Sequence, residues 1–262
     1  MCPCTEPRSE GSKNRRPVEP LNHSMERSYI AAMTPSHAAA MGPCVAVFDL
    51  DGTLTWRDTL LPFLTGYALR HPSRLKTLWR LPLAIADYLG SPDRGLLKSR
   101  AIRAVMGGDR RSTVEAWTEA FVGSLKQRRV FRPAALAAVE AHRAAGGHLV
   151  LLSASPDLYV PAIGRLLGFE RTLCTEVEWR HRGSEEDRLD GALRTPNRRG
   201  EEKSRCLAWL RTEYPNLPVV AYGNSRSDIP HLRQADRALL VNGSAAARRS
   251  ASAAGIPLAD WR

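Results

Sequence analysis

Short apolar runs alternate with longer amphipathic stretches along most of this chain. The runs are rich in β-branched and aliphatic residues and are bounded by glycine, proline or polar residues, which is typical of buried strands. They predict strands within 45–48, 146–155, 173–177, 218–222 and 238–241. The segment 178–193, which contains Asp190-Gly191, predicts a β-hairpin. Helices are predicted at 156–167, at 201–213 and after Ser244. This alternation indicates an α/β fold, a three-layer Rossmann-like parallel sheet.

A long helical insertion separates the first predicted strand from the second. Prolines and helical periodicity predict helices at 58–70, 73–89, 93–106, 110–129 and 133–145. An insertion of this length, directly after a strand that ends in charged residues, indicates a cap that covers a functional site. We therefore expect a core formed by residues 43–56 and 146–262 and a helical cap formed by 57–145. Residues 1–42 lack apolar periodicity, and we expect them to be a disordered N-terminal extension.

The net charge of +11 is concentrated in the insertion, where residues 55–146 hold 16 Lys and Arg against 7 Asp and Glu. Such an excess favours anionic partners. Within it, the apolar segment 75–89 is too short and too charged to span a bilayer. Its flanking arginines, with Trp79 and Tyr88, would suit an interfacial helix on an anionic membrane, and an ordinary helix in the interior of the cap is the simpler alternative.

Polar side chains follow three of the predicted strands, and a lysine lies near the start of the helix at 201–213. The groups concerned are Asp49, Asp51, Thr53, Ser153, Ser155, Asn224, Asp228 and Lys203. Because parallel strands deliver their carboxyl ends to one edge of a sheet, we expect these groups to converge there.

The residue types indicate phosphoryl transfer. Asp49 is the expected nucleophile, and Asp51, if protonated, donates to the leaving alkoxide and later activates water. Mg²⁺ prefers oxygen ligands, so Asp49, Asp51, Asn224 and Asp228 are the candidate metal ligands.

The phosphoryl oxygens need donors of their own. The candidates for phosphate binding are Gly52, Thr53, Ser153, Ala154 and Lys203. Gly52 and Ala154 would contribute backbone N–H groups, and Lys203 a positive charge.

Four short stretches resemble, in order, the four motifs of the haloacid dehalogenase (HAD) superfamily. They are Asp-Leu-Asp-Gly-Thr-Leu-Thr at 49–55, Ser-Ala-Ser at 153–155, Gly-Glu-Glu-Lys at 200–203 and Gly-Asn-Ser-Arg-Ser-Asp at 223–228. A helical cap between the first and second motifs resembles the phosphoserine-phosphatase-like subgroup, which has a C1-type cap. The resemblance implies a Rossmann-like core, Mg²⁺ dependence and an aspartyl-phosphate intermediate on Asp49. The chain departs from the family where Asn224 stands in place of a frequent aspartate, which removes a charge from the metal site.

We therefore expect a phosphatase that acts on a small organic phosphate monoester, such as a phosphoserine-like metabolite. The alternative substrate is a lipid phosphate of the phosphatidylglycerophosphate type at the membrane surface. The sequence does not support a nucleic-acid-binding protein. The basic segment has no exposed aromatic residues interspersed among its basic residues, and the chain has no zinc-binding or helix-turn-helix pattern. A non-catalytic scaffold is the further alternative, suggested by Asn224. The odd number of cysteines, without a Cys-Xaa-Xaa-Cys pair, favours a cytoplasmic protein, either free or peripheral to the inner membrane face.

Overall fold

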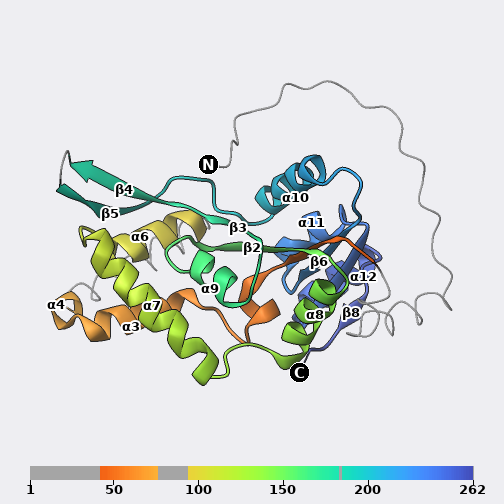
Figure 1. The fold of residues 1–262 in the computed structure, drawn as a ribbon, viewed down its shortest axis with the longest axis horizontal. Coiled ribbons are helices and arrows are strands. Elements are labelled where there is room, and N and C mark those ends of the chain that lie inside the picture. Colours follow the sequence, from red (N-terminus) through yellow and green to blue (C-terminus); the bar gives the residue numbers. More distant parts are fainter. Residues whose placement is uncertain (1–41, 76–93, 183–184, 262) are drawn as a thin grey trace.

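The computed structural model describes residues 42–75, 94–182 and 185–261, and these contain a six-stranded sheet with the order β3-β2-β1-β6-β7-β8 (Figure 1). Every neighbouring pair in this sheet is parallel. Its strands are β1 (Val45–Phe48), β2 (His148–Pro156), β3 (Arg171–Thr175), β6 (Val219–Gly223), β7 (Arg237–Val241) and β8 (Leu258–Ala259). The expected fold class, a three-layer Rossmann-like sheet, is confirmed.

The central strand β1 shows why the sheet is covered on both faces. Its four residues are fully buried, and their side chains alternate between two apolar clusters. Ala46 and Phe48 belong to one cluster, and Val45 and Val47 belong to the other. A strand buried on both faces needs a continuous apolar run, which is the pattern found in the sequence.

Helices cover the two faces. The first cluster includes residues of α8 (Pro133–Ala144) and α9 (Val160–Leu166), and the second includes residues of α10 (Glu201–Glu213), α11 (Ile229–Leu232) and α12 (Ala245–Ala253). Short helical turns, η2 (Leu50–Leu54) and η4 (Arg226–Asp228), follow β1 and β6. Asp51 and Thr53 lie on η2, and Asp228 lies on η4.

The inserted helices gather beside the carboxyl end of the sheet (Figure 1). They are α3 (Leu60–Arg70), α4 (Pro72–Leu75), α6 (Arg94–Met106) and α7 (Arg111–Gln127). The predicted hairpin is present as β4 (Val177–Arg182) and β5 (Glu185–Leu193), and it packs on α6 and α7. By contrast α8 packs on β2 and η2, with Ala135 and Ala138 buried in the first cluster. We propose that the cap ends before Pro133, whereas the sequence suggested residue 145.

Two predicted elements begin or end elsewhere. The helix expected from Pro156 begins at Val160, because β2 continues through Pro156. Asp157 remains bound beside β3, since its N–H donates to the carbonyl of Thr175 and its carboxylate accepts from the N–H of Val177. These bonds delay the turn into the helix.

Other predicted segments fall outside the described residues. They are nearly all of 1–42 and most of the helix expected at 73–89, including the apolar segment. Among the described helices, none has both the length and the apolar character needed to span a bilayer.

Candidate active site

Asp49 lies at the end of the central strand, where its carboxylate contacts Thr53, four residues further along the chain, and the distant Lys203. The ammonium of Lys203, on the first turn of α10, donates to Asp49 Oδ1 at 2.6 Å. The hydroxyl of Thr53 donates to Asp49 Oδ2 at 2.9 Å. Burial raises the pKa of Asp49 to about 7, and the Lys203 charge opposes that rise. Lys203 is thus the group that favours the ionised form of this carboxylate.

Asp228 completes a buried ion cluster with Lys203. Its Oδ1 accepts from the Lys203 ammonium at 2.7 Å. Its Oδ2 accepts from the Ser225 hydroxyl at 2.7 Å and from the N–H groups of Ser225 and Asn224 at 2.9 and 3.2 Å. Burial alone would raise the pKa of Asp228, but Lys203 outweighs it and holds this pKa below the usual range. Asp228 therefore stays ionised and is fully occupied with bonds inside the protein.

Asp51 has different partners. Its Oδ1 accepts from the N–H and the hydroxyl of Thr59, both at 2.7 Å, and its Oδ2 lies 2.6 Å from the hydroxyl of Ser155. Burial, and then the neighbouring charge of Asp58, raise the pKa of Asp51 above its usual range. The paired aspartates therefore differ, because one faces an ammonium and the other faces neutral donors.

Gly52 provides the sharp turn between the paired aspartates and the rest of η2. Its φ of +81° lies in the left-handed region, which other residues rarely adopt. A Cβ atom at this position would lie 1.9 Å from the side-chain nitrogen of Asn224. The glycine therefore leaves the space in which the Asn224 amide sits beside the first motif.

This contact leads to a prediction. If Asn224 binds Mg²⁺, as the sequence predicts, Gly52→Ala should displace its amide, lower activity and raise the Mg²⁺ concentration needed for half-maximal rate. The left-handed backbone should also cost about 1–2 kcal/mol of stability. Gly255→Ala is the matched control, since Gly255 has φ +68° with nothing within 4 Å of an added Cβ. A similar Mg²⁺ response in both variants would contradict a role for the Asn224 contact.

The predicted phosphate-binding residues do not all face the same space. Gly52, Ala154 and Lys203 line the pocket, whereas Thr53 and Ser153 are buried and do not line it. Ser153 is 1% exposed, and its hydroxyl accepts from the N–H of Ser155 at 3.0 Å. In the described conformation Ser153 thus supports the strand end, and its contact with phosphate stays a prediction.

Sequence reasoning expected Ser155 at this edge of the sheet without giving it a role, and it missed Thr59, Lys98 and Asn197. Thr59 and Ser155 hold Asp51, and Lys98 of α6 donates to the carbonyl of Ala154 and to Asn197 Oδ1. No sequence signal marks Lys98 or Asn197, which lie 99 positions apart and meet through packing of the cap on the core.

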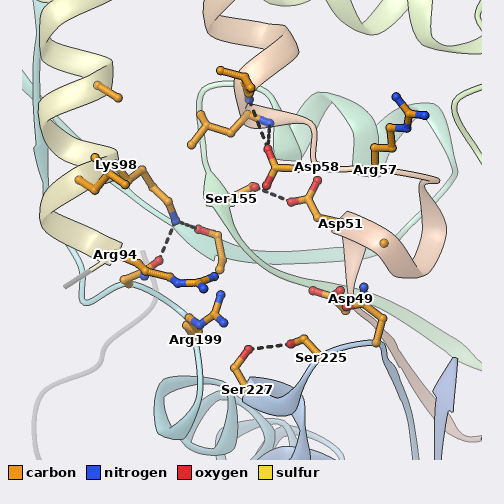
Figure 2. Close-up of a pocket in the computed structure, with 18 of the residues that line it drawn as sticks. Asp49, Asp51, Arg57, Asp58, Arg94, Lys98, Ser155, Arg199, Ser225 and Ser227 are labelled. Carbon is orange, nitrogen blue, oxygen red and sulfur yellow. Dashed lines mark hydrogen bonds between the residues drawn. The ribbon is translucent and has the colours of Figure 1, made fainter. Parts of the chain in front are cut away.

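The pocket that these groups line has a volume of about 770 Å³. Figure 2 shows Asp49 and Asp51 on one side and Arg94, Lys98 and Arg199 on the other. Burial lowers the pKa of Lys98 to about 8, and the negative charge of Asp51 opposes this decrease. The pocket thus combines a carboxylate pair with cations that attract an anionic ligand.

A parallel α/β core with this arrangement at the end of its central strand defines a class of hydrolases. The chain belongs to the family of haloacid dehalogenase-like hydrolases, which it matches over residues 46–233. The match confirms the resemblance seen in the four motifs and the assignment of the chain as a hydrolase.

Individual relatives extend the match over most of the chain. Protein CicA of Caulobacter vibrioides is 34% identical over 200 residues, which cover 74% of this chain and 84% of that protein. A Bordetella pertussis protein of unknown function has a similar structure, with a TM-score of 0.70, 22% identity and coverage of 84% of this chain and 100% of that one. A phosphoserine phosphatase, solved as a phospho-aspartyl intermediate analogue, has a TM-score of 0.57 and 13% identity over 84% of this chain and 94% of that one.

Proposed function

We propose that the protein is a Mg²⁺-dependent phosphatase that hydrolyses a small organic phosphate monoester through an aspartyl-phosphate on Asp49. The observation that carries this proposal is the contrast between the paired aspartates. Burial raises the pKa of both carboxyls, but Asp49 contacts the Lys203 ammonium at 2.6 Å, which favours its ionised form, while Asp51 is held by the neutral donors of Thr59 and Ser155. One carboxylate is therefore suited to attack and the other to proton donation. The phosphoserine phosphatase solved as a phospho-aspartyl intermediate analogue supports the same chemistry.

The proposed reaction has two steps. An oxygen of Asp49 attacks phosphorus, the bond from phosphorus to the ester oxygen breaks, and Asp51 gives its proton to the leaving alkoxide. Asp51, now ionised, takes a proton from a water molecule, which attacks phosphorus and breaks its bond to Asp49. Inorganic phosphate leaves, and both aspartates return to their initial protonation states.

The donors at this site fit Mg²⁺. Asp49 offers a carboxylate and Asn224 an amide oxygen, and both line the pocket. Within the described residues, His, Cys, Asp and Glu side chains form no group of three or more suited to a metal. We propose Asn224 rather than Asp228 as the direct ligand, because Asp228 already accepts four hydrogen bonds within the protein, whereas each oxygen of Asp49 accepts only one. When bound, Mg²⁺ would supply positive charge that lets an anionic nucleophile approach an anionic phosphate.

The role of Asp51 gives the test. Asp51→Asn should lower kcat on an alkyl phosphate by about 10²–10⁴-fold, because an alkoxide leaves poorly without a proton. The loss should be much smaller with p-nitrophenyl phosphate, whose leaving group is a far weaker base. Both rates should depend on added Mg²⁺ and stop with EDTA.

Two results would argue against this assignment. Equal losses on the alkyl and aryl esters would remove Asp51 from proton donation. Absence of hydrolysis by the parent protein across a panel of phosphate monoesters, with Mg²⁺ present, would favour the non-catalytic alternative.

A further inference from the structure

The pocket has an apolar wall that the proposed chemistry does not use. Leu60, Leu61 and Leu64 of α3 line it together with Leu97, Ala101 and Val105 of α6. The α6 residues recur at every fourth position and so share one face of the helix. The two helices pack against each other, so the wall is continuous. It lies in the same pocket as Asp49 and Asp51.

Apolar side chains at the pocket remain in contact with solvent. Leu61 is 63% exposed and Trp56 is 43% exposed, and both line the pocket. A single exposed leucine is ordinary on a protein surface, but a group of apolar side chains that lines one pocket marks a binding surface. A volume of about 770 Å³ also lies toward the upper end of the range for pockets that hold drug-sized ligands.

The acidic residues in the pocket offer little to a substrate that carries an ammonium group. Asp49 and Asp228 are bound to Lys203, and Thr59 and Ser155 hold Asp51. Asp58 accepts from the N–H groups of Leu60 and Leu61 at 2.9 and 3.3 Å, which caps the start of α3. The carboxylates are thus occupied. In the apolar wall, Leu64, Ala101 and Val105 are buried in the first cluster, but Leu60 and Leu97 are only partly buried and Leu61 is exposed.

We propose that the alcohol part of the substrate is an alkyl or acyl chain that packs on this wall. The substrate is then an amphiphilic phosphate monoester, with its phosphate at Asp49 and its chain against α3 and α6. Arg94 and Lys98 of α6, together with Arg199, lie across the pocket from Asp49 and attract an anionic substrate (Figure 2). This inference rests on the proposed phosphatase function and narrows its substrate class.

A homologous series of n-alkyl phosphates, from ethyl to octyl and below the micellar concentration, tests the wall. Burying each added methylene should raise kcat/KM by about two- to fourfold until the wall is covered. In Leu61→Asp, kcat/KM should rise much less with each added methylene. Leu69→Asp is the matched control, because Leu69 lies two turns further along α3, is 72% exposed and does not line the pocket. The inference would be overturned if kcat/KM of the parent protein did not change as methylenes are added. A higher kcat/KM on phosphoserine than on octyl phosphate would also overturn it.

Binding without turnover separates this inference from the proposed function. Calorimetry with ethyl- and octylphosphonate, which cannot be hydrolysed, should show much tighter binding of the octyl compound, and Leu61→Asp should remove that difference. If no ester is cleaved, the proposed function fails and this measurement alone decides the inference: equal affinities overturn it.

A second comparison shows whether the alkyl or acyl chain of the substrate belongs to a soluble molecule or to a membrane lipid. Octyl phosphate in solution and phosphatidic acid in phosphatidylcholine vesicles present the same type of headgroup. Faster cleavage of the soluble ester identifies a free amphiphile, and faster cleavage in the vesicle identifies a membrane lipid. Either result supports the apolar wall, whereas hydrolysis confined to short polar esters contradicts it.

Discussion

Asp49→Asn should reduce phosphate ester hydrolysis by about 10⁴-fold or more, because an amide cannot serve as the nucleophile. The side chain keeps its shape, so the protein should remain folded and bind the substrate. Acid quenching during turnover followed by mass spectrometry should show a phosphoryl group on the peptide that contains Asp49 in the parent and none in the variant. Steady-state rates on p-nitrophenyl phosphate measure the loss.

Asp58→Asn is the control for this loss. Asp58 lines the same pocket, but its carboxylate caps α3, a role that asparagine fills about equally well. Because the Asp58 charge raises the pKa of Asp51, this variant should lose some activity, but far less than Asp49→Asn. Retention of substantial turnover by Asp49→Asn, or phosphate found on another residue, would exclude the proposed intermediate.

Lys203→Met should be the most destabilising substitution at the site. Lys203 is 3% exposed and bonds to two buried carboxylates, Asp49 and Asp228. Removing one member of a buried ion cluster costs about 3–5 kcal/mol. For a chain of this size the midpoint of thermal unfolding should fall by roughly 10 °C. Activity should be lost as well, because burial then favours the protonated form of Asp49.

The pH dependence of this deficit has a definite sign. Without the ammonium, burial and mutual repulsion raise the folded-state pKa values of both carboxylates above their unfolded values. A raised carboxyl pKa means that the folded state binds more protons, so stability falls as pH rises. The loss of stability in Lys203→Met should therefore be smaller at pH 5 than at pH 8 in urea unfolding.

An exposed ion pair on the same helix provides the comparison. Arg205 bonds to Glu202 with 73% of its side chain exposed, so Arg205→Ala should cost less than about 1 kcal/mol. Equal losses for the two variants, or a deficit that does not vary with pH, would show that the buried cluster does not stabilise the fold in this way.

Much of the fold follows from local patterns. The apolar run before Asp49 could pack only in a strand buried on both faces, and Glu201–Glu213 has the bounds expected for α10. The two-residue strand β8 was missed because so short a segment carries no periodicity. The sequence of α8 predicts a helix but does not say which surface the helix covers, so the proposed end of the cap before Pro133 does not follow from the sequence. The contacts of α8 with β2 and η2 support it.

The sequence by itself determined the parallel sheet and the convergence of Asp49, Lys203 and Asp228, because parallel strands bring their carboxyl ends to one edge whatever the details of packing. Only the tertiary structure decided which way Ser153 turns and that Thr59 and Ser155 hold Asp51. Only packing of α3 and α6 beside the sheet produced the apolar wall of the pocket. The physical reason is that side-chain directions and contacts between distant helices depend on how elements fit together, which no local spacing in the chain encodes.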